Sequence, residues 1–117
     1  MGGEQLKKRT QAFGFSIIKL LNCLPRFGPA QIIGKQLVRC GTSVGANFRA
    51  ASRARSRSDF LAKLKIVEEE CDESIYWLEL LLSMQVANPN SIKKLIDEAT
   101  QILSIIVASI KTVRQNS

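Results

Sequence analysis

Histidine is missing from this sequence of 117 residues, and its absence excludes several kinds of catalysis. Serine and cysteine nucleophiles commonly need an imidazole base, and many metal sites need imidazole ligands. No other pair of catalytic groups takes the place of histidine along the chain. We therefore expect a protein that is not an enzyme and that has no cofactor.

Long hydrophobic runs are also missing, because the longest, "ILSIIVASI" at residues 102–110, is too short to span a bilayer. The chain opens with a polar, charged segment and not with a signal peptide. Its three cysteines, Cys23, Cys40 and Cys71, match no metal-binding spacing and fall on apolar stripes, so we expect buried thiols in a reducing compartment. These features predict a cytoplasmic protein with no membrane association.

Proline is scarce, and no segment alternates with the period of two that marks a β-strand. Apolar residues at heptad-like spacing instead predict helices at about 4–24, 29–54, 58–86 and 91–115. Residues 25–29, "PRFGP", separate the first two helices. Ser56 or Ser58 is expected to cap the third helix, and Asn90 or Ser91 the fourth. The chain is therefore expected to form one all-α domain over residues 1–117, an antiparallel up-down-up-down, left-handed four-helix bundle.

Small and polar residues interrupt the apolar stripe of the second helix. Gly41 and Gly45 lie four residues apart, and each costs about 1 kcal/mol relative to Ala in a helix. This cost favours a close helix crossing, either inside the bundle or between subunits. Asn47 lies on the stripe itself and needs a partner there, for which we consider Glu70 or Glu73 of the third helix, or its own helix backbone. The expected stripe is Ile33, Leu37, Cys40, Val44, Asn47, Ala51 and Ala54.

The third helix carries more apolar surface than one stripe requires. A second stripe runs beside the first, and two acidic residues are embedded in it. A helix that is apolar almost all round is usually buried on more than one side, which favours self-association. The alternative is a wide core face with an exposed Trp. The second stripe comprises Ile66, Glu70, Glu73, Trp77, Leu80 and Met84.

Acidic residues are almost absent from the first half of the chain. Residues 1–57 contain eleven Lys and Arg against Glu4 alone, a balance of +10, whereas residues 58–117 have a balance of −3. Many of these cations form a stripe on the face of the second helix opposite its apolar stripe, and such spacing suits phosphate contacts with RNA or DNA. The alternative is that Arg49 and Arg53 pair with the acidic run at 68–73. The expected nucleic-acid-binding residues are Lys35, Arg39, Arg49, Arg53, Arg55 and Arg57.

Two motifs that could hold a ligand are incomplete. "GTSVG" at residues 41–45 lacks the Gly-Lys-Ser/Thr ending of a phosphate-binding loop. "EEECDE" at residues 68–73 lacks the Glu-x-x-His pairs with which helical bundles bind two metal ions. We therefore expect no metal site, and we expect the acidic run to form ion pairs or a solvated face.

Residues 38–81 closely resemble the bacterial family of 23S rRNA intervening-sequence proteins. Its hallmarks are a Ser-x-x-x-Asn step, a basic Arg-Ala-rich turn, an Asp-Phe helix start, and Glu-x-Asp-Glu ahead of Tyr-Trp-Leu. In this chain they are Ser43 and Asn47, Arg49 to Arg57, Asp59-Phe60, Glu70-Cys71-Asp72-Glu73 and Tyr76-Trp77-Leu78.

The resemblance implies a short up-down bundle that assembles as a ring-like homopentamer and has no enzymatic activity. A related branch is the accessory variability protein of diversity-generating retroelements, which partners a reverse transcriptase. The resemblance and the charge pattern together predict a homo-oligomer that binds RNA or DNA. The alternative is a protein-interaction scaffold, or an accessory subunit of a nucleic-acid enzyme such as a reverse transcriptase.

Overall fold

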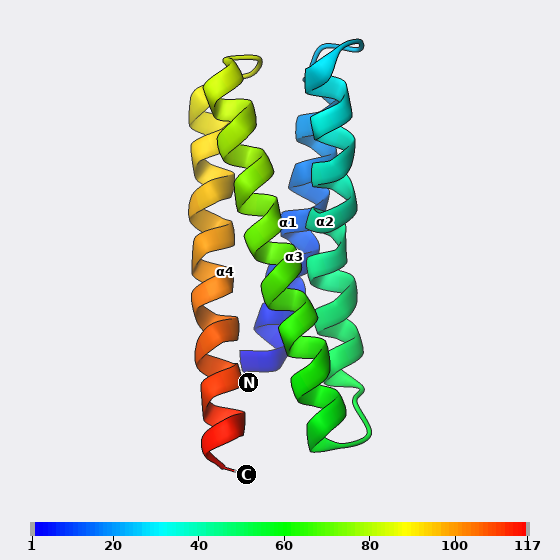
Figure 1. The fold of residues 1–117 in the computed structure, drawn as a ribbon, viewed down its shortest axis with the longest axis vertical. Helices are drawn as coiled ribbons and strands as arrows, with labels where there is room; N and C mark the ends of the chain where they lie inside the picture. The colour runs from blue at the N-terminus through cyan, green and yellow to red at the C-terminus, as the bar shows by residue number, and fades with distance from the viewer. Residues whose placement is uncertain (1, 117) are drawn as a thin grey trace.

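Four antiparallel α-helices form an elongated bundle in the computed structural model, which describes residues 2–116 (Figure 1). The helices are α1 (Gly2–Asn22), α2 (Pro29–Ser52), α3 (Arg57–Met84) and α4 (Pro89–Gln115). They pack in chain order, and α4 closes the bundle against α1, giving overall dimensions of 47 × 20 × 20 Å. No strand occurs within residues 2–116. The prediction of an all-α chain with four helices is confirmed, and assembly into a ring stays a prediction.

The helix starts follow the capping residues closely. Pro29 opens α2 after Gly28, whose φ of 91° suits a residue without a side chain. The Ser56 hydroxyl accepts a hydrogen bond from the Asp59 N–H (3.1 Å) at the start of α3, which agrees with one of the two expected caps. α4 instead begins two residues before the expected 91, with Asn88 as its cap, because a proline is well suited to the first helical position.

Three helices end two residues before the predicted limits of 24, 54 and 86. After α1 the chain tightens into a turn in which the Cys23 N–H donates to the Leu20 carbonyl (2.9 Å). After α3, Gln85 takes a left-handed conformation with φ 57°, a position that glycine usually occupies. No glycine follows any of these three helices to mark its end in the sequence, so the apolar periodicity alone overestimates the length of the helices.

The core consists mainly of aliphatic side chains from all four helices, together with Phe13 of α1 and Phe48 of α2. On α2 the buried position next to Val44 is Phe48, not the expected Asn47, which is half-buried. Cys40 and Cys71 are buried as expected, but the prediction for Cys23 is wrong because it lies beyond the end of α1 and is exposed. The fully buried side chains include Phe13, Ile17, Leu37, Val44, Leu64, Val67, Leu78, Leu81, Ile92, Ile102 and Ile106.

Glycine backbones let α1 and α2 approach closely. A Cβ atom added to Gly45 would lie 3.2 Å from the Thr10 carbonyl carbon, and one added to Gly14 would lie 3.4 Å from the Thr42 Cα. A Cβ atom on Gly41 would meet the Ile17 side chain at 3.0 Å. Of the two crossings that the glycines allow, the structure therefore shows the one inside the bundle.

The contact between α1 and α4 is the least extensive of those between neighbouring helices, and it includes a set of side-chain hydrogen bonds. Arg9 donates to both carboxylate oxygens of Glu98, at 3.0 and 2.7 Å, and to Gln101 at 3.1 Å. This pairing raises the pKa of Arg9, chiefly through the hydrogen bond to Glu98. Across the described helices, none is both long and apolar enough to cross a membrane.

Candidate nucleic-acid interface

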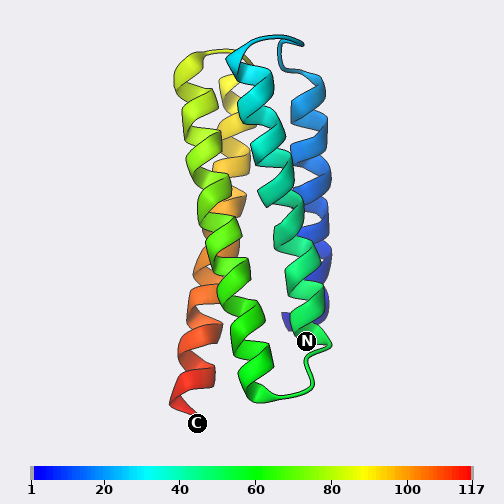
Figure 2. The ribbon, with the colours of Figure 1, turned by 45° about the vertical axis from the view of Figure 1, so that its right-hand side comes forward.

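The uneven charge of the sequence becomes two different sides of the molecule. The α1–α2 hairpin and the turn that follows it contain the basic half of the chain, and the α3–α4 hairpin contains the acidic half. Both interhelical loops of these hairpins lie at one end of the bundle, while the α2–α3 turn lies at the other end with the chain termini (Figure 2). A negatively charged polymer is therefore attracted to the α1–α2 side.

Arg39 is the member of the basic stripe that pairs with the acidic run. Its guanidinium group donates to Glu70 at 3.4 Å and also to Glu73. The Trp77 Nε1–H donates to the same Glu73 carboxylate (3.0 Å) and, together with Arg39, lowers its pKa. The hydrogen bond to Glu73 in turn raises the pKa of Arg39. Arg39 is thus engaged by two carboxylates, and its contact with nucleic acid stays a prediction.

Arg49 and Arg53 lie farther along the chain than Arg39 and form no ion pair with these glutamates. An α-helix rises about 1.5 Å and turns about 100° per residue, so Arg49 lies about 15 Å beyond Arg39 along α2 and is rotated from it by about 80°. Both Arg49 and Arg53 are exposed and form no ion pair with any residue between 2 and 116. The alternative in which the acidic run neutralises these two arginines is therefore wrong.

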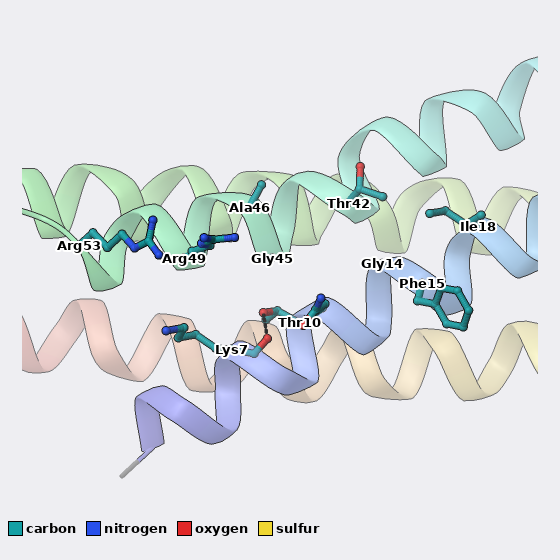
Figure 3. A pocket seen from close by; sticks show the side chains of 11 residues that line it. Lys7, Thr10, Gly14, Phe15, Ile18, Thr42, Gly45, Ala46, Arg49 and Arg53 are labelled. Atoms are coloured by element: carbon teal, nitrogen blue, oxygen red, sulfur yellow. Dashed lines mark hydrogen bonds between the residues drawn. The ribbon is translucent and has the colours of Figure 1, made fainter.

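A groove of about 540 Å³ between α1 and α2 brings Arg49 and Arg53 together with residues of the first helix. Lys7 of α1 lies at the same end of the groove as the two arginines, and its amine is 3.8 Å from the exposed Glu4 carboxylate. The other end holds two apolar side chains (Figure 3). The groove is lined by Lys7, Thr10, Gln11, Gly14, Phe15, Ile18, Thr42, Gly45, Ala46, Arg49 and Arg53.

The remaining expected cations are all exposed but lie outside the groove. Arg55 lies in the α2–α3 turn and Arg57 is the first residue of α3, so both lie at the end of the bundle toward which the Lys7–Arg53 end of the groove points. Lys35 lies near the beginning of α2, toward the opposite end. The structure therefore gathers four of the six expected residues near one end.

The second apolar stripe of α3 is partly used within the bundle. Trp77 and Met84 pack against the core, and Leu80 is half-buried. Ile66 is 36% exposed, and Tyr76, ten residues farther along α3, is 58% exposed. The apolar surface left for another subunit is thus smaller than the sequence suggested, and it includes a tyrosine that was not expected there.

Asn47 uses the second of its two expected partners. Its side-chain Nδ2–H donates to the Ser43 carbonyl of its own helix at 2.9 Å. Glu70 and Glu73, the other candidates, are occupied by Arg39. Asn47 therefore makes no hydrogen bond to α3.

Sequence reasoning missed the contribution of α1 to the groove. Lys7, Phe15 and Ile18 lie on a helix whose apolar stripe drew attention only to the core. Gly14, in the middle of that helix, was the available signal, because a mid-helix glycine often marks a close approach of another backbone.

The fold and this surface define a class of protein, a small antiparallel four-helix bundle with one strongly basic side. Residues 4–108 match the model of the 23S rRNA-intervening sequence protein family. The chain therefore belongs to this family, as the resemblance predicted.

A solved structure supports the assignment. The chain is similar to a protein of unknown function from the S23 ribosomal protein family of Bacteroides thetaiotaomicron VPI-5482, seen in a crystal structure. The two are 32% identical and superpose with a TM-score of 0.84, covering 95% of this chain and 99% of the other. A comparison with curated proteins found no match.

Proposed function

We propose that this protein is a non-enzymatic, basic homo-oligomer of the cytoplasm that binds RNA or DNA through contacts with phosphate groups. One observation carries the proposal: Arg49 and Arg53 are exposed, form no ion pair within residues 2–116, and share a groove with Lys7. Unpaired guanidinium groups are good phosphate ligands because they donate several hydrogen bonds from a planar fork.

The contacts we propose are to the nucleic-acid backbone. The groove offers Lys and Arg but no Asn, Asp or Glu, and Gln11 is its one side-chain amide. Phosphate contacts position a protein on a nucleic acid without reading its sequence. Arg55 and Arg57 extend the same charge beyond the end of α2. Binding is therefore expected to be sensitive to salt and weakly specific for sequence.

Binding of a fluorescent RNA or DNA oligonucleotide, measured by anisotropy at several salt concentrations, tests the proposal. Replacing Arg49 and Arg53 together with Gln removes two phosphate contacts. We expect the slope of log K against log salt to become shallower by about 1.4 for a single strand and about 1.8 for a duplex.

The matched control is Lys93→Gln with Lys94→Gln. This pair removes the same net charge from exposed positions on α4 and leaves the groove intact. The control should retain the wild-type salt slope. Absence of binding at low salt, or equal loss in both double variants, would contradict the proposed phosphate site.

Self-association forms the second part of the proposal, and a ring of five subunits is what the family resemblance implies. Its support is the apolar surface on α3, where Ile66 and Tyr76 stay exposed in the single chain. Light scattering at micromolar concentration measures the mass directly. A species of 13.0 kDa, the mass of one chain, would refute self-association.

A protein-interaction scaffold is the second candidate function. Tyr76 favours it, because its ring is exposed and packs edge-to-face on Trp77, with the ring centroids 5.0 Å apart. Exposed aromatic residues are enriched in protein interfaces. Tyr76→Ala should then weaken capture of a partner such as a polymerase from nuclease-treated lysate, whereas Arg49→Gln with Arg53→Gln should not.

A further inference from the structure

The aromatic ring of Phe15 lies in the same groove as the unpaired arginines. Its side chain is 62% exposed, although the neighbouring Phe13 is buried in the core. Figure 3 shows Phe15 and Ile18 at one end of the groove and Lys7, Arg49 and Arg53 at the other. A large ring left open to water beside a cluster of cations needs an explanation.

The dimensions of the groove can be derived from the helix register. Gly45 lies against Thr10, and Thr42 lies against Gly14, so Phe15 is close to the level of Thr42 along the bundle. Arg49 is seven residues beyond Thr42, which corresponds to about 10 Å at the rise of an α-helix. Glycine and other small residues form most of the wall between them, and Gln11, one helical turn from both Lys7 and Phe15, is the large side chain on this stretch.

We propose that this groove binds single-stranded nucleic acid, with phosphates at Lys7, Arg49 and Arg53 and one base stacked on Phe15. The inference rests on the proposed function and names its substrate class. Proteins that bind single strands combine a positive groove with aromatic rings, because every base offers a flat face for stacking. In a duplex the base faces are already stacked, so Phe15 would gain nothing there.

Lys19 fits this arrangement. Its amine lies over the Phe15 ring, 5.5 Å from the centroid, and so covers one face by a cation–π contact. Phe15 remains 62% exposed with Lys19 in this position, which leaves ring surface for a base, and the amine adds a cation near the same strand. Lys19 therefore stabilises the position of the ring, and it is not among the residues that line the groove.

An acidic helix of a protein partner fits the groove less well. A docked helix needs several apolar anchors spaced along a hydrophobic groove. Phe15 and Ile18 are the only large apolar side chains among the lining residues, and both lie at one end. A charged strand with a flat base needs only cations at one end and a ring at the other.

The test compares Phe15→Leu with Phe27→Leu in the full-length protein. Phe27 is a matched control, since it is 87% exposed in the α1–α2 loop and lies outside the groove. Anisotropy is measured with a 12-nucleotide labelled single strand and with its duplex, and circular dichroism confirms that each variant folds. Phe15→Leu should weaken binding of the single strand about tenfold and leave its salt slope unchanged. Phe15→Trp should retain wild-type affinity.

The outcomes distinguish the stacking inference at Phe15 from the phosphate site at Arg49 and Arg53. If Phe15→Leu leaves the single strand bound as in the wild type while Arg49→Gln with Arg53→Gln weakens it, the stacking inference fails and the phosphate site stands. Equal weakening of single strand and duplex by Phe15→Leu also overturns the inference. If neither set of variants changes oligonucleotide binding, the groove serves another ligand and both proposals fail.

Discussion

The two hairpins of this bundle pack by different means. The α1–α2 hairpin packs through backbone, because Gly14, Gly41 and Gly45 remove side chains from the crossing. The α3 helix packs through large apolar side chains such as Leu78 and Leu81, which are fully buried. The two helix backbones fill the room that the missing side chains would take, and Gly14 and Gly45 also line the basic groove. The glycines that allow the close crossing therefore also keep this groove free of their side chains.

The arginines of α2 show the same division. Arg39 forms ion pairs with two glutamates of α3. Arg49 instead lines the groove between α1 and α2 and forms no ion pair within residues 2–116. The two arginines are ten residues apart, about 2.8 helical turns, and the periodicity of α2 alone does not show that one is paired and the other is not. The partner helix on each side decides which cations stay available.

Leu78→Ala should have the largest effect on the α3 side. Leu78 is fully buried, so its truncation leaves a cavity and should lower the free energy of unfolding by about 2–5 kcal/mol. Urea unfolding followed by circular dichroism measures this loss, with the exposed neighbour Glu79→Ala as the control. A similar urea midpoint for both variants would mean that the buried Leu78 side chain does not stabilise the bundle.

Gly45→Val should have the next largest effect, on the α1–α2 side. The added Cβ would lie 3.2 Å from the Thr10 backbone, which cannot move without shifting α1. We expect a loss of about 1–3 kcal/mol in the free energy of unfolding. Gly3→Ala is the control, because a Cβ there has no neighbour within 4 Å, and it should be neutral or stabilising.

Glu73→Gln should have a smaller effect that depends on pH. Hydrogen bonds from Trp77 and Arg39 lower the pKa of Glu73 in the folded state below its unfolded value. Its contribution is therefore present at neutral pH and is lost as the pH falls through the folded-state pKa. The variant should lose less stability than the wild type between pH 7 and pH 3 in urea titrations. Equal losses would show that the hydrogen bonds from Trp77 and Arg39 to the Glu73 carboxylate contribute nothing to stability.

The smallest effect concerns the thiols and leaves stability unchanged. Burial raises the pKa of Cys71 to about 12 and also raises that of Cys40, whereas Cys23 is exposed. A thiol reagent at pH 8 should therefore modify one cysteine quickly in the native protein and three in urea. Cys23→Ser should abolish the fast reaction. Fast modification of two or three native thiols would contradict the buried positions.

The sequence predicts where the helices begin better than it predicts which side chains meet on the surface. Proline and serine mark the starts of α2 and α3 because their local chemistry is sufficient for capping. The end of α3 is not predictable in the same way, since Gln85 adopts a left-handed conformation that a residue other than glycine rarely takes. The groove depends on the register of α1 against α2, in which Gly45 meets Thr10. One residue of slip would change that register without changing the pattern of either helix.

A titration followed by amide NMR shifts tests the central claim most directly. The claim is that the glycine-rich, basic hairpin is the side that binds nucleic acid. On adding a single-stranded oligonucleotide at low salt, the largest shifts should fall on Gly14, Thr42, Gly45 and the α2 residues up to Arg53. Amides along the outer faces of α3 and α4 should change little. Largest shifts on α3 and α4, with Gly14 and Gly45 unmoved, would contradict the account.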